Sequence, residues 1–213
     1  MKELVDRLKN SEVVCFKTDT VYGLSCNPFS DEAVKTVFDL KQRNTNSPLI
    51  LLISRNYDYK NIVKSNPLAE KLIKRFWPGP LTIIFESKVK FAKGVVYNGK
   101  VSLRMPNDEF CQSLLSQVDF PLTSTSANIS GKENPNNFKV LKMLFPSVFV
   151  VDGGKVSKDC PSSIVDVSDN SLKIIREGKI GKQELIDAVN EKDDWWRWCY
   201  IIKTILFKQR VVV

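Results

Sequence analysis

Short apolar segments alternate with amphipathic stretches through the first 181 residues, and this alternation constrains the fold more than any other feature of the chain. Segments rich in β-branched and aromatic residues, which is typical of buried strands, lie at 12–16, 48–53, 81–85, 101–105 and 120–125. Between them, apolar residues recur at helical spacing. Alternating strands and helices predict an α/β fold.

Three polar residues mark where helices should begin. Ser30 precedes an acidic first turn and Asn66 precedes a proline, and both arrangements are favourable at a helix N-terminus. Asn107 stands before a third helical segment and is expected to cap it. The helix after Ser30 should run through 31–41, which places Lys41 at its end.

Composition limits the classes of function. With 213 residues and 43% hydrophobic content, the chain can bury the core of one large domain. The absence of histidine removes the usual general base and the commonest nitrogen ligand for metals. The formal net charge of +8 favours phosphates, nucleotides or nucleic acid as partners, although a generally lysine-rich surface explains it equally well.

The five cysteines show neither metal-ligand spacing nor a dense disulfide pattern, which favours a reducing, cytoplasmic compartment. We expect a domain at 1–181 and a C-terminal tail at 182–213. The apolar runs of this tail are too short to cross a membrane, which takes about 20 residues, so we predict no transmembrane segment. A terminal helix and strand packed on the core or on a second subunit is one interpretation of the tail, and a segment that docks on a membrane surface or on a partner is the other.

Four polar segments follow strand-like stretches, at 18–23, 41–43, 123–128 and 161–166. Ligands of open α/β sheets collect at strand ends, so these segments could line one cleft. Lys41, Arg43, Ser126 and Asn128 would supply the cations and polar donors that phosphate groups need. Each segment also has a structural explanation, since cations suit helix C-termini and hydroxyls suit turns.

Taken in order, TDTVYGL, KQR, WPGPLT, LRMP, SANISG, SSIVD and IREG resemble the motifs of the YrdC-like threonylcarbamoyl-AMP synthases, over about residues 10–181. The resemblance implies a single YrdC-like domain: an open, twisted mixed sheet with flanking helices and a ligand cleft at strand ends. By this resemblance we expect the short form of the family, without the second C-terminal domain of longer members.

The resemblance also implies an activity. The family joins L-threonine, bicarbonate and ATP into threonylcarbamoyl-AMP and pyrophosphate, which serves the formation of N6-threonylcarbamoyladenosine in tRNA. Mg²⁺ would accompany the phosphates of ATP, and no metal ligands from the protein itself are expected. Downstream threonylcarbamoyl transferase proteins and RNA or tRNA are the expected macromolecular partners.

The same resemblance implies a role for each residue that matches a family motif. Lys41 and Arg43 would be catalytic, holding phosphates and drawing charge from the reacting centre, and we expect neither side chain to belong to the core. L-threonine would be bound by Thr20, Arg104, Ser124 and Ser162. ATP would be bound by Arg43, Ser47, Lys100, Ser126, Asn128, Asn134 and Arg176.

The sequence departs from the family at four positions. The family usually has proline at Lys17 and Thr125, and histidine at Ser47 and Leu52. Two other functions stay open at this point. One is a non-catalytic RNA-binding module of the same fold, and the other is a domain that handles carbamoyl-adenylate made from another carbamoyl source.

Overall fold

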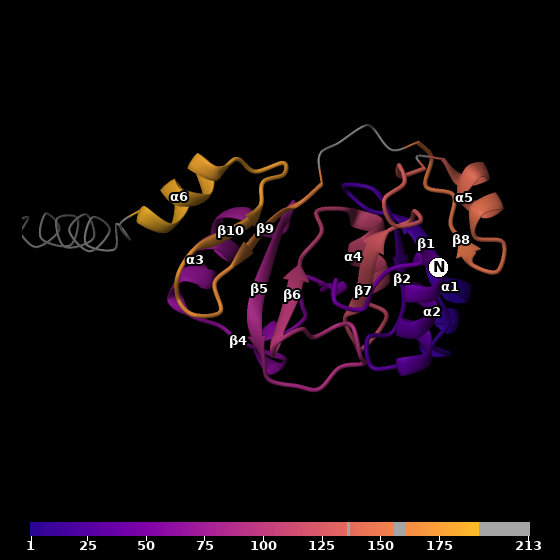
Figure 1. Ribbon diagram of the computed structural model, residues 1–213, viewed down its shortest axis with the longest axis horizontal. Coiled ribbons are helices and arrows are strands. Elements are labelled where there is room, and N and C mark those ends of the chain that lie inside the picture. Colours follow the sequence, from indigo (N-terminus) through magenta and orange to yellow (C-terminus); the bar gives the residue numbers. More distant parts are fainter. Residues whose placement is uncertain (136, 156–160, 192–213) are drawn as a thin grey trace, which may run out of the picture.

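The computed structural model describes residues 1–135, 137–155 and 161–191, and these form a twisted ten-stranded sheet with helices packed against it (Figure 1). The strands are β1 Val14–Lys17, β2 Tyr22–Ser25, β3 Ile50–Leu52, β4 Val63–Lys64, β5 Leu81–Ser87, β6 Lys100–Arg104, β7 Leu122–Ser126, β8 Phe149–Val150, β9 Ser163–Asp166 and β10 Lys173–Arg176. The α-helices in these ranges are α1 Lys2–Lys9, α2 Asp31–Lys41, α3 Pro67–Phe76, α4 Glu109–Leu115, α5 Phe138–Leu144 and α6 Lys182–Asn190, with a 3₁₀ turn at Tyr59–Asn61.

The sheet is open and mixed. Its strand order is β10-β9-β5-β6-β3-β7-β2-β1-β8, and β4 pairs with β5 beside this path. The pairs β1–β8, β3–β6 and β5–β9 are parallel, while the remaining neighbours are antiparallel. The predicted fold class, an α/β protein with an open, twisted mixed sheet and flanking helices, is therefore confirmed.

Both faces of the sheet bury apolar side chains. Successive residues of a strand point to opposite faces, so Leu51 belongs to a large core with α2 and α3, whereas Leu52 belongs to a second core with α1 and α4. Cys15 and Phe16 of β1 divide between the two cores in the same way. The sheet is thus a central layer whose loops and strand ends carry the polar segments found in the sequence.

Two of the three predicted helix caps are confirmed. Ser30 Oγ accepts a hydrogen bond from the backbone nitrogen of Ala33 (3.2 Å), and Asn66 Oδ1 accepts one from Ala69 (2.9 Å). The prediction for Asn107 is wrong, because Asp108 caps α4 and accepts from the backbone nitrogen of Cys111 at 2.8 Å.

Helix α6 extends the core beyond residue 181, where the sequence placed the end of the domain. It lies beside α3 (Figure 1), and its Leu185 and Ala188 are buried in the large core. Lys71 Nζ of α3 also donates to the carbonyl oxygen of Val189 (3.0 Å). The tryptophan-rich segment of the predicted tail lies outside the described residues. Among the helices of the described ranges, none has the length and apolar character that crossing a membrane requires.

Candidate active site

The Lys41 side chain is buried and is held by the loop that follows β7. Helix α2 ends at Lys41, where Gln42 takes a left-handed conformation (φ 49°) and turns the chain. Lys41 is 1% exposed, and its ammonium group donates to the carbonyl oxygens of Ser126 and Asn128 and to Asn128 Oδ1, the last two at 2.8 and 3.0 Å. An ammonium group has three donors, and all three are used here. The expectation that Lys41 lies outside the core is therefore wrong.

The same loop is further fixed by its own side chains. Ser126 Oγ donates to Asn128 Oδ1 (2.6 Å), and Asn128 Nδ2 donates to the carbonyl oxygen of Lys132 (2.6 Å). The Asn128 amide thus links the Lys41 ammonium, the Ser126 hydroxyl and the backbone beyond the loop. This network gives the hydroxyl-rich segment a defined shape.

Arg43 lies two residues beyond Lys41 and reaches the same loop. Its Nε donates to the carbonyl oxygen of Ser47 (2.9 Å), and its Nη1 donates to Thr125 Oγ1 (3.2 Å). Burial, and after it the nearby charge of Arg43, lowers the pKa of Lys41 to about 8. Two cations held this close create a positive potential that an anionic ligand would relieve.

Arg104, at the end of β6, is the centre of a second cationic group. This guanidinium is 3% exposed; its Nη1 donates to Thr20 Oγ1 (2.9 Å) and its Nε to the carbonyl oxygen of Gly79 (3.1 Å). Nη2 lies 2.6 Å from Asp19 Oδ1. These two buried atoms form an ion pair without the alignment of a hydrogen bond, and neither has a hydrogen-bond partner among the described residues.

Arg176 joins this group through the chain segment before β9. Its Nη2 donates to the carbonyl oxygen of Ser162 (2.7 Å), and Ser162 Oγ is 2.9 Å from Thr82 Oγ1 of β5. Burial, and after it the charge of Arg104, lowers the pKa of Arg176, so the two guanidinium groups are close enough to repel. Gly178 lets the chain after β10 pack against the segment before β9, because a Cβ there would lie 2.3 Å from the carbonyl oxygen of Pro161.

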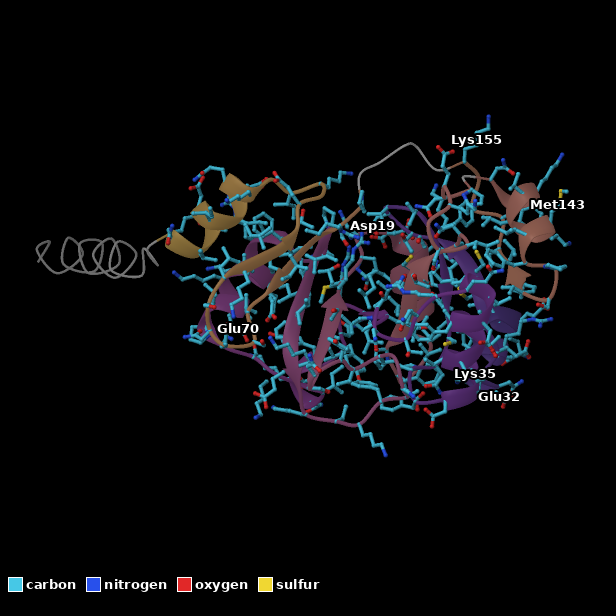
Figure 2. The ribbon with its side chains drawn as sticks, in the orientation of Figure 1. Asp19, Glu32, Lys35, Glu70, Met143 and Lys155 are labelled. Carbon is cyan, nitrogen blue, oxygen red and sulfur yellow. The ribbon has the colours of Figure 1, made fainter. Side chains whose placement is uncertain are left out.

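Strand pairing places the two cationic groups, Lys41 with Arg43 and Arg104 with Arg176, on neighbouring parts of the sheet. Gly23 of β2 pairs with Ser126 of β7, and Thr20 lies three residues before Gly23. A Cβ on Gly23 would lie 3.1 Å from Ser124 Oγ, so β2 passes close to the predicted threonine ligand Ser124, which is 8% exposed. In Figure 2, Asp19 lies toward the centre of the molecule, between β5 and β6 on one side and β1 and β2 on the other.

Three predicted ATP ligands do not join these groups. Lys100 begins β6, at the opposite end from Arg104, and its Nζ forms an ion pair with Asp166 Oδ2 (2.7 Å). Ser47 and Asn134 are exposed, and the Arg43 contact with Ser47 uses its carbonyl oxygen only. Leu52, where the family usually has histidine, is fully buried in the second core.

Two residues that contact the predicted site residues were not singled out from the sequence. The carbonyl oxygen of Gly79 orients Arg104, and the Thr82 hydroxyl meets Ser162. Both residues lie in the WPGPLT motif, and this motif was the sequence signal that could have identified them. The Gly79 position excludes a side chain, because a Cβ there would lie 2.5 Å from the carbonyl oxygen of Phe76.

Fold and site together define a class: an α/β protein with an open mixed sheet that gathers cations and hydroxyl groups in one region. The sequence profile of the Sua5/YciO/YrdC family, described as "Telomere recombination", matches residues 6–178. The chain belongs to this family.

Curated relatives cover most of the chain. A protein of Methanocaldococcus jannaschii, provisionally named threonylcarbamoyl-AMP synthase, is 37% identical over 86% of this chain and 90% of its own length. The threonylcarbamoyl-AMP synthase of Histophilus somni (strain 2336) is 34% identical over 83% of this chain and 98% of its own. That of Pyrococcus abyssi is 32% identical over 86% of this chain, which spans only 55% of that longer protein.

Solved structures agree with this assignment. The structure of P. abyssi Sua5 complexed with L-threonine has a TM-score of 0.81 at 30% identity and covers 89% of this chain and 57% of that one. The crystal structure of E. coli YciO, at 20% identity, shares the fold with a TM-score of 0.77 over 86% of this chain and 90% of its own.

Proposed function

We propose that this protein is an L-threonylcarbamoyladenylate synthase, a nucleotidyltransferase that makes threonylcarbamoyl-AMP and pyrophosphate from L-threonine, bicarbonate and ATP. The observation that carries the proposal is the buried Arg104 guanidinium beside Thr20. The curated names of the relatives and the threonine complex of P. abyssi Sua5 support the same activity.

Arg104 would bind the carboxylate of threonine, since a guanidinium fork matches a carboxylate geometrically. Asp19 holds this guanidinium from one side, at 2.6 Å, and thereby orients it. Thr20, Ser124 and Ser162 would supply hydroxyl contacts to the rest of the amino acid.

ATP would lie over the loop that follows β7, with Arg43 close to its phosphates and Ser126 and Asn128 along the nucleotide. Because all three donors of Lys41 already bind this loop, Lys41 would act by positioning the loop. Arg176 would contact the α-phosphate, which has to lie near the carbamate formed on the threonine amine when the two substrates react. Ser47, Lys100 and Asn134 are weaker proposals, since they lie outside the two cationic groups.

The reaction needs alignment and charge neutralisation more than a proton shuttle. The threonine amine, once deprotonated, attacks bicarbonate and forms a carbamate with loss of water. A carbamate oxygen then attacks the α-phosphorus, and pyrophosphate leaves. Cationic side chains aimed at the phosphates stabilise the charge that develops in this step, so the absence of histidine is no obstacle.

Mg²⁺ would enter with ATP, bound to its phosphates. In the described ranges, no group of three or more His, Cys, Asp or Glu side chains could hold a metal ion. In nucleotide sites, substrate phosphates and water usually supply most ligands of magnesium. We also propose a cytoplasmic location, with the product passing to threonylcarbamoyl transferase proteins that act on tRNA.

Calorimetric titration with L-threonine tests the assignment of Arg104. Arg104→Ala should weaken threonine binding by roughly tenfold or more, since a charge-assisted contact contributes on the order of 1.5–3 kcal/mol. Arg55→Ala is the matched control, because Arg55 is an exposed partner of Glu109. Equal affinities of the wild type and a folded Arg104→Ala variant would contradict the assignment.

A further inference from the structure

Two oppositely charged atoms beside Thr20 are buried and lack a hydrogen-bond partner. Nη2 of Arg104 and Oδ1 of Asp19 lie 2.6 Å apart, yet their ion pair does not have the alignment of a hydrogen bond, and neither atom has another partner in the described ranges. Burying a polar group without a partner costs free energy, so a ligand that pairs with both atoms would be favoured here.

The remaining polar atoms of both side chains are engaged and hold them in place. Arg104 donates from Nε to the carbonyl oxygen of Gly79 and from Nη1 to Thr20 Oγ1. Asp19 Oδ2 accepts from the backbone nitrogen of Asn107, in the segment between β6 and α4, at 3.1 Å. What remains for a ligand is a fixed donor, Arg104 Nη2, beside a fixed acceptor, Asp19 Oδ1.

The turn that carries Asp19 is also fixed by its own hydrogen bonds. Thr18 Oγ1 accepts from the backbone nitrogen of Thr20 (3.2 Å) and donates to the carbonyl oxygen of Val21 (2.8 Å). The Asp19 side chain keeps 14% of its surface exposed, so a small ligand can reach it. A carboxylate that is held in place before the ligand arrives loses little conformational entropy on binding.

A donor and an acceptor side by side suit the head group of an α-amino acid. Its amine and its carboxylate are bonded to the same carbon atom, so they also lie side by side. The carboxylate can accept from the guanidinium group, and the ammonium group, which has three donors, can donate to the Asp19 carboxylate. A ligand with a carboxylate alone would leave Asp19 Oδ1 unpaired and would bring two negative charges together.

We propose that Asp19 binds the α-amino group of L-threonine through Oδ1, while Arg104 binds the threonine carboxylate. This rests on the proposed function, which assigns the carboxylate to Arg104, and it gives Asp19 a second role besides orienting that guanidinium. The contact makes the site selective for an α-amino acid, because a ligand without the amine leaves a buried carboxylate oxygen unpaired. It also positions the nitrogen atom that has to attack bicarbonate.

Ligand-observed NMR titrations of the full chain with two ligands test the proposal. One ligand is L-threonine. The other is (R)-3-hydroxybutanoate, which has the same carboxylate and hydroxyl group but a hydrogen atom in place of the amine. The wild type should bind L-threonine about tenfold or more tightly than this analogue. Asp19→Asn should weaken threonine binding by about tenfold, because the amide carries no charge, and should weaken binding of the analogue far less.

The analogue separates this contact from a role that acts through Arg104 alone. If Asp19 only orients the guanidinium, Asp19→Asn weakens both ligands by the same factor, because both carry the carboxylate, and that result would overturn the proposal. An unchanged affinity for threonine in this variant would also overturn it. Asp39→Asn makes the same change at an exposed position of α2; it is the matched control and should alter neither affinity.

The wild type alone provides a second measurement that does not depend on the folding of a variant. Equal affinities of the wild type for the two ligands would overturn the amine contact and leave the carboxylate assignment of Arg104 intact. A wild type that binds neither ligand would contradict the threonine site of the proposed function, and the amine contact would fall with it.

Discussion

At the scale of single residues, Lys41 connects the stability of the protein to its candidate site. Replacing Lys41 with alanine leaves three acceptors of the loop after β7 without their donor. The free energy of unfolding should fall by about 1–3 kcal/mol, as it does when buried polar groups lose their partners. Urea denaturation of Lys41→Ala beside Lys35→Ala, whose side chain is exposed, measures the effect. Equal losses in both variants would show that Lys41 does not hold the loop.

Lys41 should also make stability depend on pH. Its pKa is about 8 in the folded protein and 10.5 for the ordinary group, so the unfolded chain binds more protons between these pH values. The contribution of Lys41 to the free energy of unfolding therefore rises as pH increases through this window, and is least favourable below it. The difference between wild type and Lys41→Met, measured by urea denaturation across this range, isolates the effect from other groups. A difference that stays constant or falls with pH would contradict the assignment.

The sequence predicted which polar segments form the candidate site. It predicted less well how their side chains are used. The motifs named Arg104 with Thr20, and Lys41 with Asn128, and the structure places each pair in contact. The burial of Lys41 could not be predicted locally, because a cation at a helix C-terminus is ordinarily exposed and favourable there. Only the fold shows that a loop from β7, 85 residues further along the chain, covers its ammonium group.

At the scale of secondary-structure elements, α6 should stabilise the domain although it lies beyond the recognisable motifs. A chain that ends at residue 181 loses the burial of Leu185 and Ala188 and the contacts of Lys71, whereas a chain that ends at residue 191 keeps them. The shorter chain should be less stable by about 2–4 kcal/mol, on the basis of the apolar burial alone. Denaturant midpoints of the two truncated chains measure the difference. Superimposable unfolding curves would mean that α6 adds nothing to the core.

Elements with strong local signals were predicted well, and the shortest strands were not. Ser30 and Asn66 mark helix starts because their side chains replace missing backbone acceptors. In the Asn107–Asp108 pair both residues can cap, and the contact of the Asn107 backbone nitrogen with Asp19 accompanies capping by Asp108. Strands β4 and β8 have two residues each, which is too short for a period-two pattern to emerge from the sequence.

At the scale of the whole molecule, the sheet explains how distant segments form one site. The chain returns to the same region of the sheet from β1, β6, β7 and the segment before β9, and no neighbouring residues could create the resulting set of cations and hydroxyls. The alternation of strands and helices predicted this class of fold. It did not predict the order of the strands, which depends on long-range packing.

Product analysis of the purified full chain is the measurement that tests the central claim most directly. The protein would be incubated with ATP, Mg²⁺, L-threonine and bicarbonate, and the nucleotides identified by mass spectrometry. We predict threonylcarbamoyl-AMP and pyrophosphate in equal amounts, no ADP, and dependence on both threonine and bicarbonate. Arg43→Ala should slow turnover by about 10²–10³-fold, as loss of one preorganised electrostatic donor does. Pyrophosphate release that is absent, or that needs neither threonine nor bicarbonate, would contradict the synthase assignment.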